Sequence, residues 1–128
     1  MKLHAMMIFV TDIQVAEDFY SKTLNFRIKS RSSRHLVFSH EGSDFLMFKC
    51  ENKSEITEYG SSARSVFVFE VSSVDKSMSE LRRKGVHFLH EKPAENEFCY
   101  YAAFADPFGN IHEICELKQE TNQLFESA

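Results

Sequence analysis

The sequence has no tryptophan, only four glycines and two prolines in 128 residues, and three cysteines that lie far apart. With so few glycines it contains no glycine-rich loop of the kind that cradles phosphate groups. Cys50, Cys99 and Cys115 form no CxxC pair and are odd in number, which argues against a disulfide framework or a zinc ribbon. No apolar stretch approaches the roughly 20 residues of a membrane-spanning helix, so we expect no membrane partner.

A strong charge of one sign is also missing. The net charge is −4, and the lysines and arginines are scattered without the basic stripe that a nucleic-acid reader needs. The apolar opening Leu3–Val10 follows a single lysine and has no small-residue cleavage site, so we interpret it as a strand and not as a signal peptide. We therefore expect a cytoplasmic protein that binds no nucleic acid.

The composition is that of one globular domain. Hydrophobic residues make up 43% of the chain and charged residues 27%, which excludes a disordered tail or a fibrous protein. A chain of this length buries roughly two-thirds of the surface that its unfolded form exposes, which is enough for a stable core without disulfide bonds or bound metals. Thirteen phenylalanines predict that Phe fills much of that core.

One pattern occurs twice along the chain. In each half an apolar, strand-like run is followed by a helical pattern and then by three further strand-like segments. The predicted strands are Ala5–Val10, Phe26–Ser30, Arg34–His40 and Asp44–Glu51 in the first half, and Val66–Val71, Val86–His90, Phe98–Ala105 and Asn110–Leu117 in the second.

Helix boundaries can be placed in both halves. Thr11 with Gln14 fits a capping box, and Ser72 with Asp75 is a looser version of it. The helices are predicted to end at the residues best suited to a left-handed conformation, Asn25 and Gly85.

The predicted fold class is α+β: tandem βαβββ modules whose small mixed sheets pair within one domain, residues 1–128. Module one covers about residues 3–51, a polar linker about 52–63, module two about 64–117, and a polar tail 118–128.

Several short motifs give the sequence a family resemblance. They are Val10-Thr11-Asp12-Ile13, Phe19-Tyr20 and Leu24-Asn25-Phe26 in the first module, and Phe69-Glu70-Val71, Gly85-Val86-His87-Phe88 and Asp106-Pro107-Phe108-Gly109-Asn110-Ile111-His112-Glu113 in the second. With these motifs the chain resembles the vicinal-oxygen-chelate superfamily of glyoxalase I, bleomycin-resistance proteins, fosfomycin-resistance enzymes and extradiol dioxygenases. The resemblance implies that the sheets roll into a cup, that enzymatic members hold a divalent metal there with four side chains, and that the chain forms a homodimer.

The same resemblance places the four metal-ligand positions at Ala5, about Phe48, Val66 and Glu113. Only Glu113 carries a donor atom, and one carboxylate cannot hold a divalent ion that wants four to six ligands. His4 and His112 stand next to two of these positions, but side chains alternate along a strand, so both are expected on the opposite face. We therefore expect no metal and no other cofactor, with a recruited, non-standard divalent-metal site as the alternative.

Alternation also predicts what lines the cup. The expected ligand-binding residues are Ala5, Met7, Leu46, Phe48, Val66, Val68, Tyr101 and Glu113. Glu113 is the candidate catalytic residue, as a general base on a bound carbonyl compound. It could instead pair with a cationic ligand, or be a relic held by a neighbouring polar group.

Three functional classes stay open. The first and preferred one is a metal-independent protein of the bleomycin-resistance type that binds or sequesters an apolar or aromatic small molecule, including a cationic one. The second is a divalent-metal lyase, isomerase or dioxygenase of the glyoxalase type. The third is a non-catalytic interaction dimer whose cup is closed.

Overall fold

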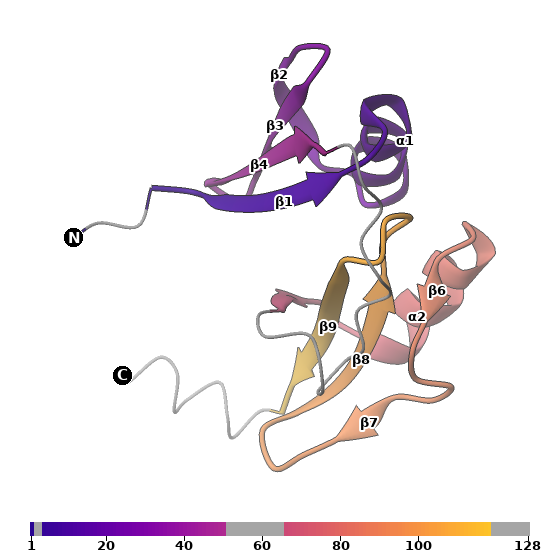
Figure 1. The fold of residues 1–128 in the computed structure, drawn as a ribbon. Helices are drawn as coiled ribbons and strands as arrows, with labels where there is room; N and C mark the ends of the chain where they lie inside the picture. The colour runs from indigo at the N-terminus through magenta and orange to yellow at the C-terminus, as the bar shows by residue number, and fades with distance from the viewer. Residues whose placement is uncertain (2–3, 51–65, 119–128) are drawn as a thin grey trace. The chain divides into compact units, whose positions relative to one another are not determined.

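The computed structural model describes residue 1 and residues 4–50 and 66–118 (Figure 1). The chain divides into two compact units, Met1–Glu55 (the first unit) and Ile56–Ala128 (the second unit). Each unit holds one mixed sheet and one helical segment, so the predicted α+β class with its tandem modules is confirmed. The predicted linker, 52–63, and the tail beyond residue 118 lie outside the described residues.

In the first unit the sheet has the strand order β1-β4-β3-β2. β1 runs parallel to β4, and the other two pairs are antiparallel. Each of the predicted strands forms, with ends that differ by one or two residues. The elements are β1 (Met6–Val10), α1 (Ile13–Glu17), the π-helix η1 (Asp18–Thr23), β2 (Arg27–Arg31), β3 (His35–His40) and β4 (Ser43–Lys49).

The second unit repeats this topology with the strand order β5-β9-β8-β6. Here the outer edge of β8 pairs with two short strands in succession, β6 and the unpredicted β7. The predicted strand Val86–His90 is therefore shorter than expected. The elements are β5 (Phe67–Glu70), α2 (Val74–Arg83), β6 (His87–Phe88), β7 (Ala94–Glu95), β8 (Cys99–Ala105) and β9 (Ile111–Leu117).

The predicted helix caps are wrong by one residue in both units. Asp12 Oδ1 accepts a hydrogen bond from the Val15 backbone N–H at 3.0 Å, and Ser73 Oγ accepts one from Lys76 N–H at 3.2 Å. Asp12 and Ser73 have extended backbones, so each helix begins one residue after the cap. Thr11 and Ser72 are the capping residues of neither helix.

The predicted helix ends are confirmed. Asn25 has φ 63° and Gly85 has φ 91°, the left-handed conformation that stops a helix. The first helical segment nevertheless widens before it ends: Leu24 N–H donates to the Phe19 carbonyl and Phe26 N–H to the Tyr20 carbonyl, at 3.0 and 2.8 Å. The sequence did not predict this π-helical turn. It accompanies a fully buried Tyr20.

Each helical segment covers one face of its own sheet. α1 packs against β3, and α2 packs against β6, β8 and β9. The Tyr20 ring lies 5.8 Å from Phe38 in the first unit, and both side chains are fully buried; in the second unit His112 of β9 is 1% exposed. No helix in the described part of the chain has the length and apolar character needed to cross a membrane.

Candidate functional site

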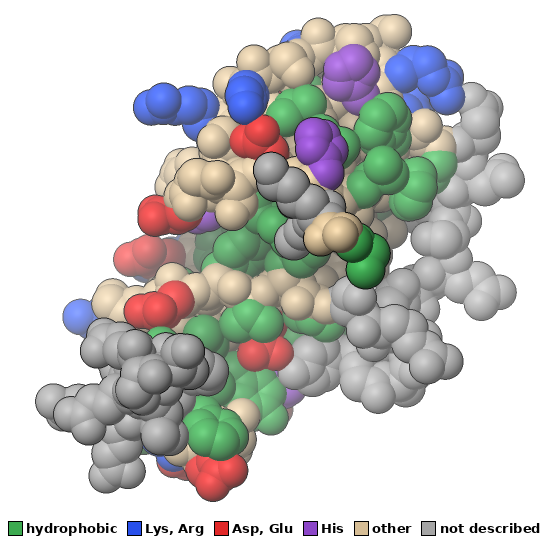
Figure 2. All heavy atoms as spheres, turned by 90° about the vertical axis from the view of Figure 1, so that its left-hand side faces the viewer, with side chains coloured by type: hydrophobic (Ala, Val, Ile, Leu, Met, Phe, Trp, Pro, Cys, Tyr) green, Lys and Arg blue, Asp and Glu red, His purple; other side chains and the backbone are tan. Residues whose placement is uncertain are grey.

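The face of the first sheet that is turned away from its own helix is hydrocarbon-rich; we call it the helix-free face. Ile8 and Val10 of β1 are buried, whereas Met7 and Phe9 between them are 51% and 59% exposed. The strand register pairs Met7 with Leu46 and Phe9 with Phe48. Of the predicted ligand-binding residues in this unit, Met7, Leu46 and Phe48 thus share one face, and Ala5 directly precedes β1. Apolar side chains at the molecular surface are drawn green in Figure 2.

The helix-free face of the second sheet mixes apolar groups with acids and thiols. Val68 is 54% exposed and lies beside Glu113, which is half-buried and has Ala103 as its partner on β8. Tyr101 pairs with Cys115 on the same face. The structure thus brings together Val68, Tyr101 and Glu113, and Val66 directly precedes β5.

The registers relate the two units position by position. Met7 pairs with Leu46 in the parallel strands β1 and β4, and Val68 pairs with Glu113 in the parallel strands β5 and β9. Each is the second residue pair of its register. By this internal comparison the counterpart of Glu113 is Leu46, two residues before Phe48, the approximate position given by the resemblance. Neither a leucine nor a phenylalanine side chain offers a donor atom, so the count of possible metal ligands does not change.

Glu113 lies in an acidic neighbourhood. Burial, with smaller contributions from the nearby Cys99, Glu113 and Glu70, raises the pKa of the Cys115 thiol to about 11. Burial and Glu113 likewise raise the pKa of Cys99 above its usual value. Both thiols are therefore protonated and poorly nucleophilic at neutral pH.

The side chains at the four family positions do not fit a divalent metal. Of the positions that the resemblance implies, Ala5, Val66 and Phe48 (or its register alternative Leu46) carry no donor atom, and Glu113 alone can coordinate. Within residues 4–50 and 66–118, no group of three or more His, Cys, Asp or Glu side chains could hold a metal ion. His112, adjacent to Glu113, is 1% exposed on the helix-covered face among Phe67, Phe69 and Phe104, with ring centroids 5.5–5.9 Å away.

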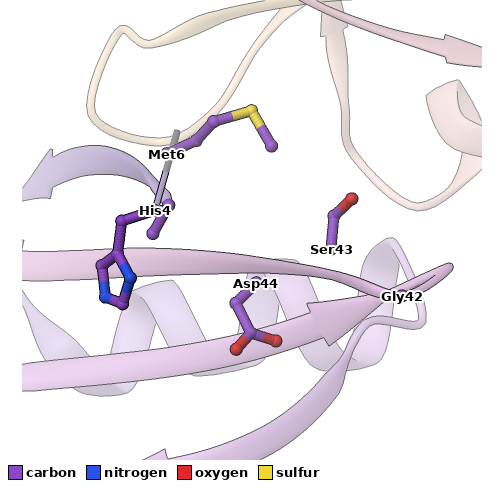
Figure 3. A pocket seen from close by; sticks show the side chains of 6 residues that line it. His4, Met6, Gly42, Ser43 and Asp44 are labelled. Atoms are coloured by element: carbon purple, nitrogen blue, oxygen red, sulfur yellow. The ribbon is translucent and has the colours of Figure 1, made fainter. Parts of the chain in front are cut away.

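The first unit contains a pocket of about 250 Å³ where β1 and β4 begin (Figure 3). It holds two metal-binding residue types, His4 and Asp44, and Asp44 already pairs with Lys29 at 2.9 Å. This set suits a small polar molecule better than a metal ion. The pocket is lined by His4, Ala5, Met6, Gly42, Ser43 and Asp44.

A buried aspartate fixes the turn that leads into the strand of Glu113. Asp106 is 5% exposed; its Oδ1 accepts hydrogen bonds from Phe108 N–H and Asn110 N–H at 2.9 and 2.8 Å, and its Oδ2 accepts one from Asn110 Nδ2 at 2.8 Å. Gly109 supplies a φ of 87°. The turn sets the β8–β9 register and so places Glu113 opposite Ala103.

Sequence reasoning missed His90, which it assigned to a strand. The imidazole Nδ1 accepts a hydrogen bond from Ala103 N–H at 2.9 Å, and the ring meets Tyr101 edge to face at 5.6 Å. Pro93, three residues on, was the available signal, since proline interrupts strand pairing and restricts the residue before it.

The sequence matches the profile of the Glyoxalase/Bleomycin resistance protein/Dioxygenase superfamily over residues 2–114. The chain therefore belongs to this superfamily, as its motifs predicted. A comparison with curated proteins found no match.

Solved structures share the fold at low sequence identity. A genomically encoded fosfomycin resistance protein, FosX, from Listeria monocytogenes is 17% identical with a TM-score of 0.75, covering 94% of this chain and 97% of that one. A glyoxalase family protein from Enterococcus faecalis is 18% identical with a TM-score of 0.73, covering 90% and 97%. A lactoylglutathione lyase from Agrobacterium tumefaciens is 19% identical with a TM-score of 0.68, covering 90% and 92%. FosX has also been solved in complex with Mn(II) and sulfate.

Proposed function

We propose that this chain is a metal-independent small-molecule-binding member of the superfamily, which binds or sequesters an apolar or aromatic ligand and prefers a cationic one. The observation that carries the proposal is that three of the four ligand positions implied by the resemblance, Ala5, about Phe48 (Leu46 by the register comparison) and Val66, carry hydrocarbon side chains, whereas the fourth is the carboxylate of Glu113. Such positions cannot polarise a substrate through an ion, but within the second unit Glu113 can accept a positive charge and Tyr101 can contact an aromatic ring.

Each helix-free face has a proposed part in binding. In the first unit, Ala5, Met7, Leu46 and Phe48 offer apolar contact area, of which Met7 and Phe48 are exposed. In the second unit, Val66, Val68 and Tyr101 offer apolar contacts and Glu113 accepts from a cationic or hydrogen-bonding group.

The enzymatic alternatives have less support. A glyoxalase-type reaction through a divalent metal needs ligands that this chain lacks at three of the four positions implied by the resemblance. FosX, which was solved with Mn(II), is therefore no guide to metal binding in this chain. Glu113 as a general base without a metal remains chemically feasible, and we propose it as the second role to test. The thiols of Cys99 and Cys115 are poor nucleophile candidates, because the pKa of each is raised.

We also propose a homodimer in the cytoplasm. The exposed apolar side chains Met7, Phe9 and Val68 are the surface feature that favours an association of this kind. Sedimentation of the purified protein at micromolar concentration measures it directly, and a monomer at all concentrations would contradict it.

The binding proposal is tested with a matched pair of probes, phenethylamine, which is a cation at neutral pH, and phenethyl alcohol, its uncharged analogue. A probe at 100 times its dissociation constant stabilises the protein by about 2.7 kcal/mol, which a thermal-shift assay detects. We expect the cation to be preferred, the preference to disappear in Glu113→Gln, and Val68→Ala, beside Glu113 in the second unit, to weaken both probes. Glu80→Gln on the exposed surface of α2 is the matched control and should retain the preference.

Metal analysis of the same preparation separates the two main classes. We expect less than stoichiometric Mn, Ni, Zn or Fe, and unchanged probe binding after treatment with a chelator. One equivalent of tightly held metal, whose removal abolishes binding or activity, would overturn the proposal in favour of the metal-dependent class.

A further inference from the structure

The outer edge of β8 is interrupted in the middle. β6 pairs with Phe104 and Ala105, and β7 pairs with Tyr100 and Tyr101, so the chain between β6 and β7 leaves the ladder opposite Ala103. The Ala103 carbonyl still accepts a hydrogen bond from Leu89 N–H at 2.8 Å. The Ala103 N–H donates to the His90 side chain, which takes the place of a strand carbonyl.

This hydrogen bond defines the protonation state of the imidazole. A ring nitrogen that accepts an N–H has no hydrogen of its own, so Nδ1 of His90 is unprotonated and Nε2 carries the proton of the neutral ring. In the protonated ring Nδ1 would present an N–H to the N–H of Ala103, and two donors cannot bond each other. The contact exists only with neutral His90.

The same ring supports a residue of the proposed binding face. The His90 and Tyr101 rings stand at 88° with centroids 5.6 Å apart, the edge-to-face arrangement that aromatic pairs prefer. Tyr101 lies on the helix-free face beside Cys115, two pairs along the β8–β9 ladder from Ala103 and Glu113. If the His90 ring leaves the β8 edge, Tyr101 therefore loses this edge-to-face contact.

The charged and titratable groups around His90 include one from each neighbouring element. From α2, Arg82 donates to the backbone carbonyls of His90 and Glu91 at 2.8 and 2.9 Å, so it anchors the segment independently of the imidazole. From β8, Tyr101 contacts the ring itself. The backbone is thus held by Arg82 while the side chain is held by Ala103, and only the second contact depends on the imidazole proton.

We infer that His90 is a positioning residue: its neutral imidazole closes the break between β6 and β7 and holds Tyr101 on the face that carries Glu113. Protonation of the imidazole breaks the hydrogen bond with Ala103 and removes the contact that holds Tyr101. The consequence for ligand affinity, a loss at acidic pH, rests on the proposed binding function. The positioning itself does not, and it is measurable without a ligand.

The test is amide hydrogen exchange of Ala103 by NMR at pH 7.5 and pH 5.0, corrected for intrinsic exchange rates. For the wild type we expect protection to fall about five- to tenfold at the lower pH, the size of one net hydrogen bond. His90→Asn offers an amide oxygen near the place of Nδ1 and does not titrate, so it should protect Ala103 equally at both pH values. His90→Leu offers no acceptor and should leave Ala103 weakly protected at both.

His87→Asn is the matched control, since His87 is an exposed histidine on β6 and the variant should behave like the wild type. The Tyr101 ring resonances should shift between pH 7.5 and pH 5.0 in the wild type and should not shift over the same range in His90→Asn. Equal Ala103 protection in the wild type and His90→Leu, or a His90 ring protonated on Nδ1 at neutral pH, would overturn the inference.

Phenethylamine affinity at the two pH values then tests the functional consequence. We expect the wild type to lose affinity at pH 5.0 and His90→Asn to keep it. Normal exchange behaviour without phenethylamine binding would contradict the proposed function and leave the positioning role intact, so the two failures are distinguishable.

Discussion

Phe45 in the first unit and His112 in the second lie at matching places, each opposite the first residue of the neighbouring parallel strand. Both are buried, at 4% and 1% exposure. Next to them, Leu46 and Glu113 also match, one apolar and one acidic. The ionisable members of both pairs belong to the second unit. The comparison teaches that the βαβββ framework accepts either an apolar or an ionisable residue at both of these matched positions.

The turns that precede these residues differ most, and they give the largest predicted effect. Asp106→Ala removes the acceptor of three hydrogen bonds in a buried turn, whereas the corresponding turn of the first unit contains the exposed Glu41. We expect Asp106→Ala to lower the free energy of unfolding by about 4 kcal/mol and Glu41→Ala by less than about 0.5 kcal/mol. Urea denaturation measures both, and similar losses would show that the two turns are equivalent.

The matched pair Phe45 and His112 predicts a pH dependence in the second unit. Burial lowers the pKa of His112 from 6.5 to about 4, against a smaller opposing influence of Asp106. The unfolded chain therefore binds a proton that the folded chain rejects as the pH falls from 6.5 towards 4. Stability should decrease across that window, by about 3 kcal/mol at its lower end, and be unaffected by this group above it.

His112→Phe gives the second unit the residue type of the first and is the control for this prediction. Urea unfolding at pH 7, 6, 5 and 4 should show a smaller acid-side decline in the variant than in the wild type. Parallel pH profiles for the two proteins would mean that His112 is not the group responsible.

The helix caps should behave similarly in the two units, with a moderate effect. Asp12→Ala and Ser73→Ala each remove the acceptor for one helix N–H, at an expected cost of about 1 kcal/mol. In the second unit Glu116 Oε1 also accepts from Val74 N–H at 3.0 Å, so the loss at Ser73 should be the smaller one. Thr11→Ala and Ser72→Ala are the neighbouring controls, and a larger loss in either would restore the caps predicted from the sequence.

Two ion pairs that reach across a central strand should have the smallest effect. Lys29 of β2 pairs with Asp44 of β4 across β3, and Lys118, after β9, pairs with Glu95 of β7 across β8. Lys118 also lies over the Tyr100 ring at 5.1 Å. We expect Lys29→Ala to change the unfolding free energy by less than about 0.5 kcal/mol and Lys118→Ala to lower the urea midpoint slightly more, because Lys118 also contacts the Tyr100 ring. If the difference between the two variants vanishes in 1 M salt, then charge alone accounts for it.

Much of the framework could be predicted from the sequence because it is encoded locally. Alternating apolar residues located the strands of Figure 1 other than β7 to within one or two residues, and Asn25 and Gly85 marked the helix ends because few other residues adopt a positive φ. The caps were misplaced because two capable residues stand side by side in each unit, Thr11 with Asp12 and Ser72 with Ser73.

The features that escaped prediction depend on contacts distant in the sequence. The π-helical turn accompanies the burial of Tyr20 against Phe38, and β7 exists through its pairing with β8. The acceptor role of His90 follows from a gap in the sheet and not from its neighbours in the chain. The apolar character of Ala5 and Val66 could be read directly from the sequence, whereas the match between Leu46 and Glu113 required the strand registers.

The edge strand β2 limits the extension of the first sheet by a second copy of this protein. All five of its residues are exposed, three of them, Arg27, Lys29 and Arg31, are basic, and the register shifts between Ile28 and Ser30. A second molecule that approached this edge to extend the sheet would meet an irregular backbone and the same cations. We therefore expect resistance to fibril-like growth at this border, so that neutralising substitutions there would shorten the lag before aggregation.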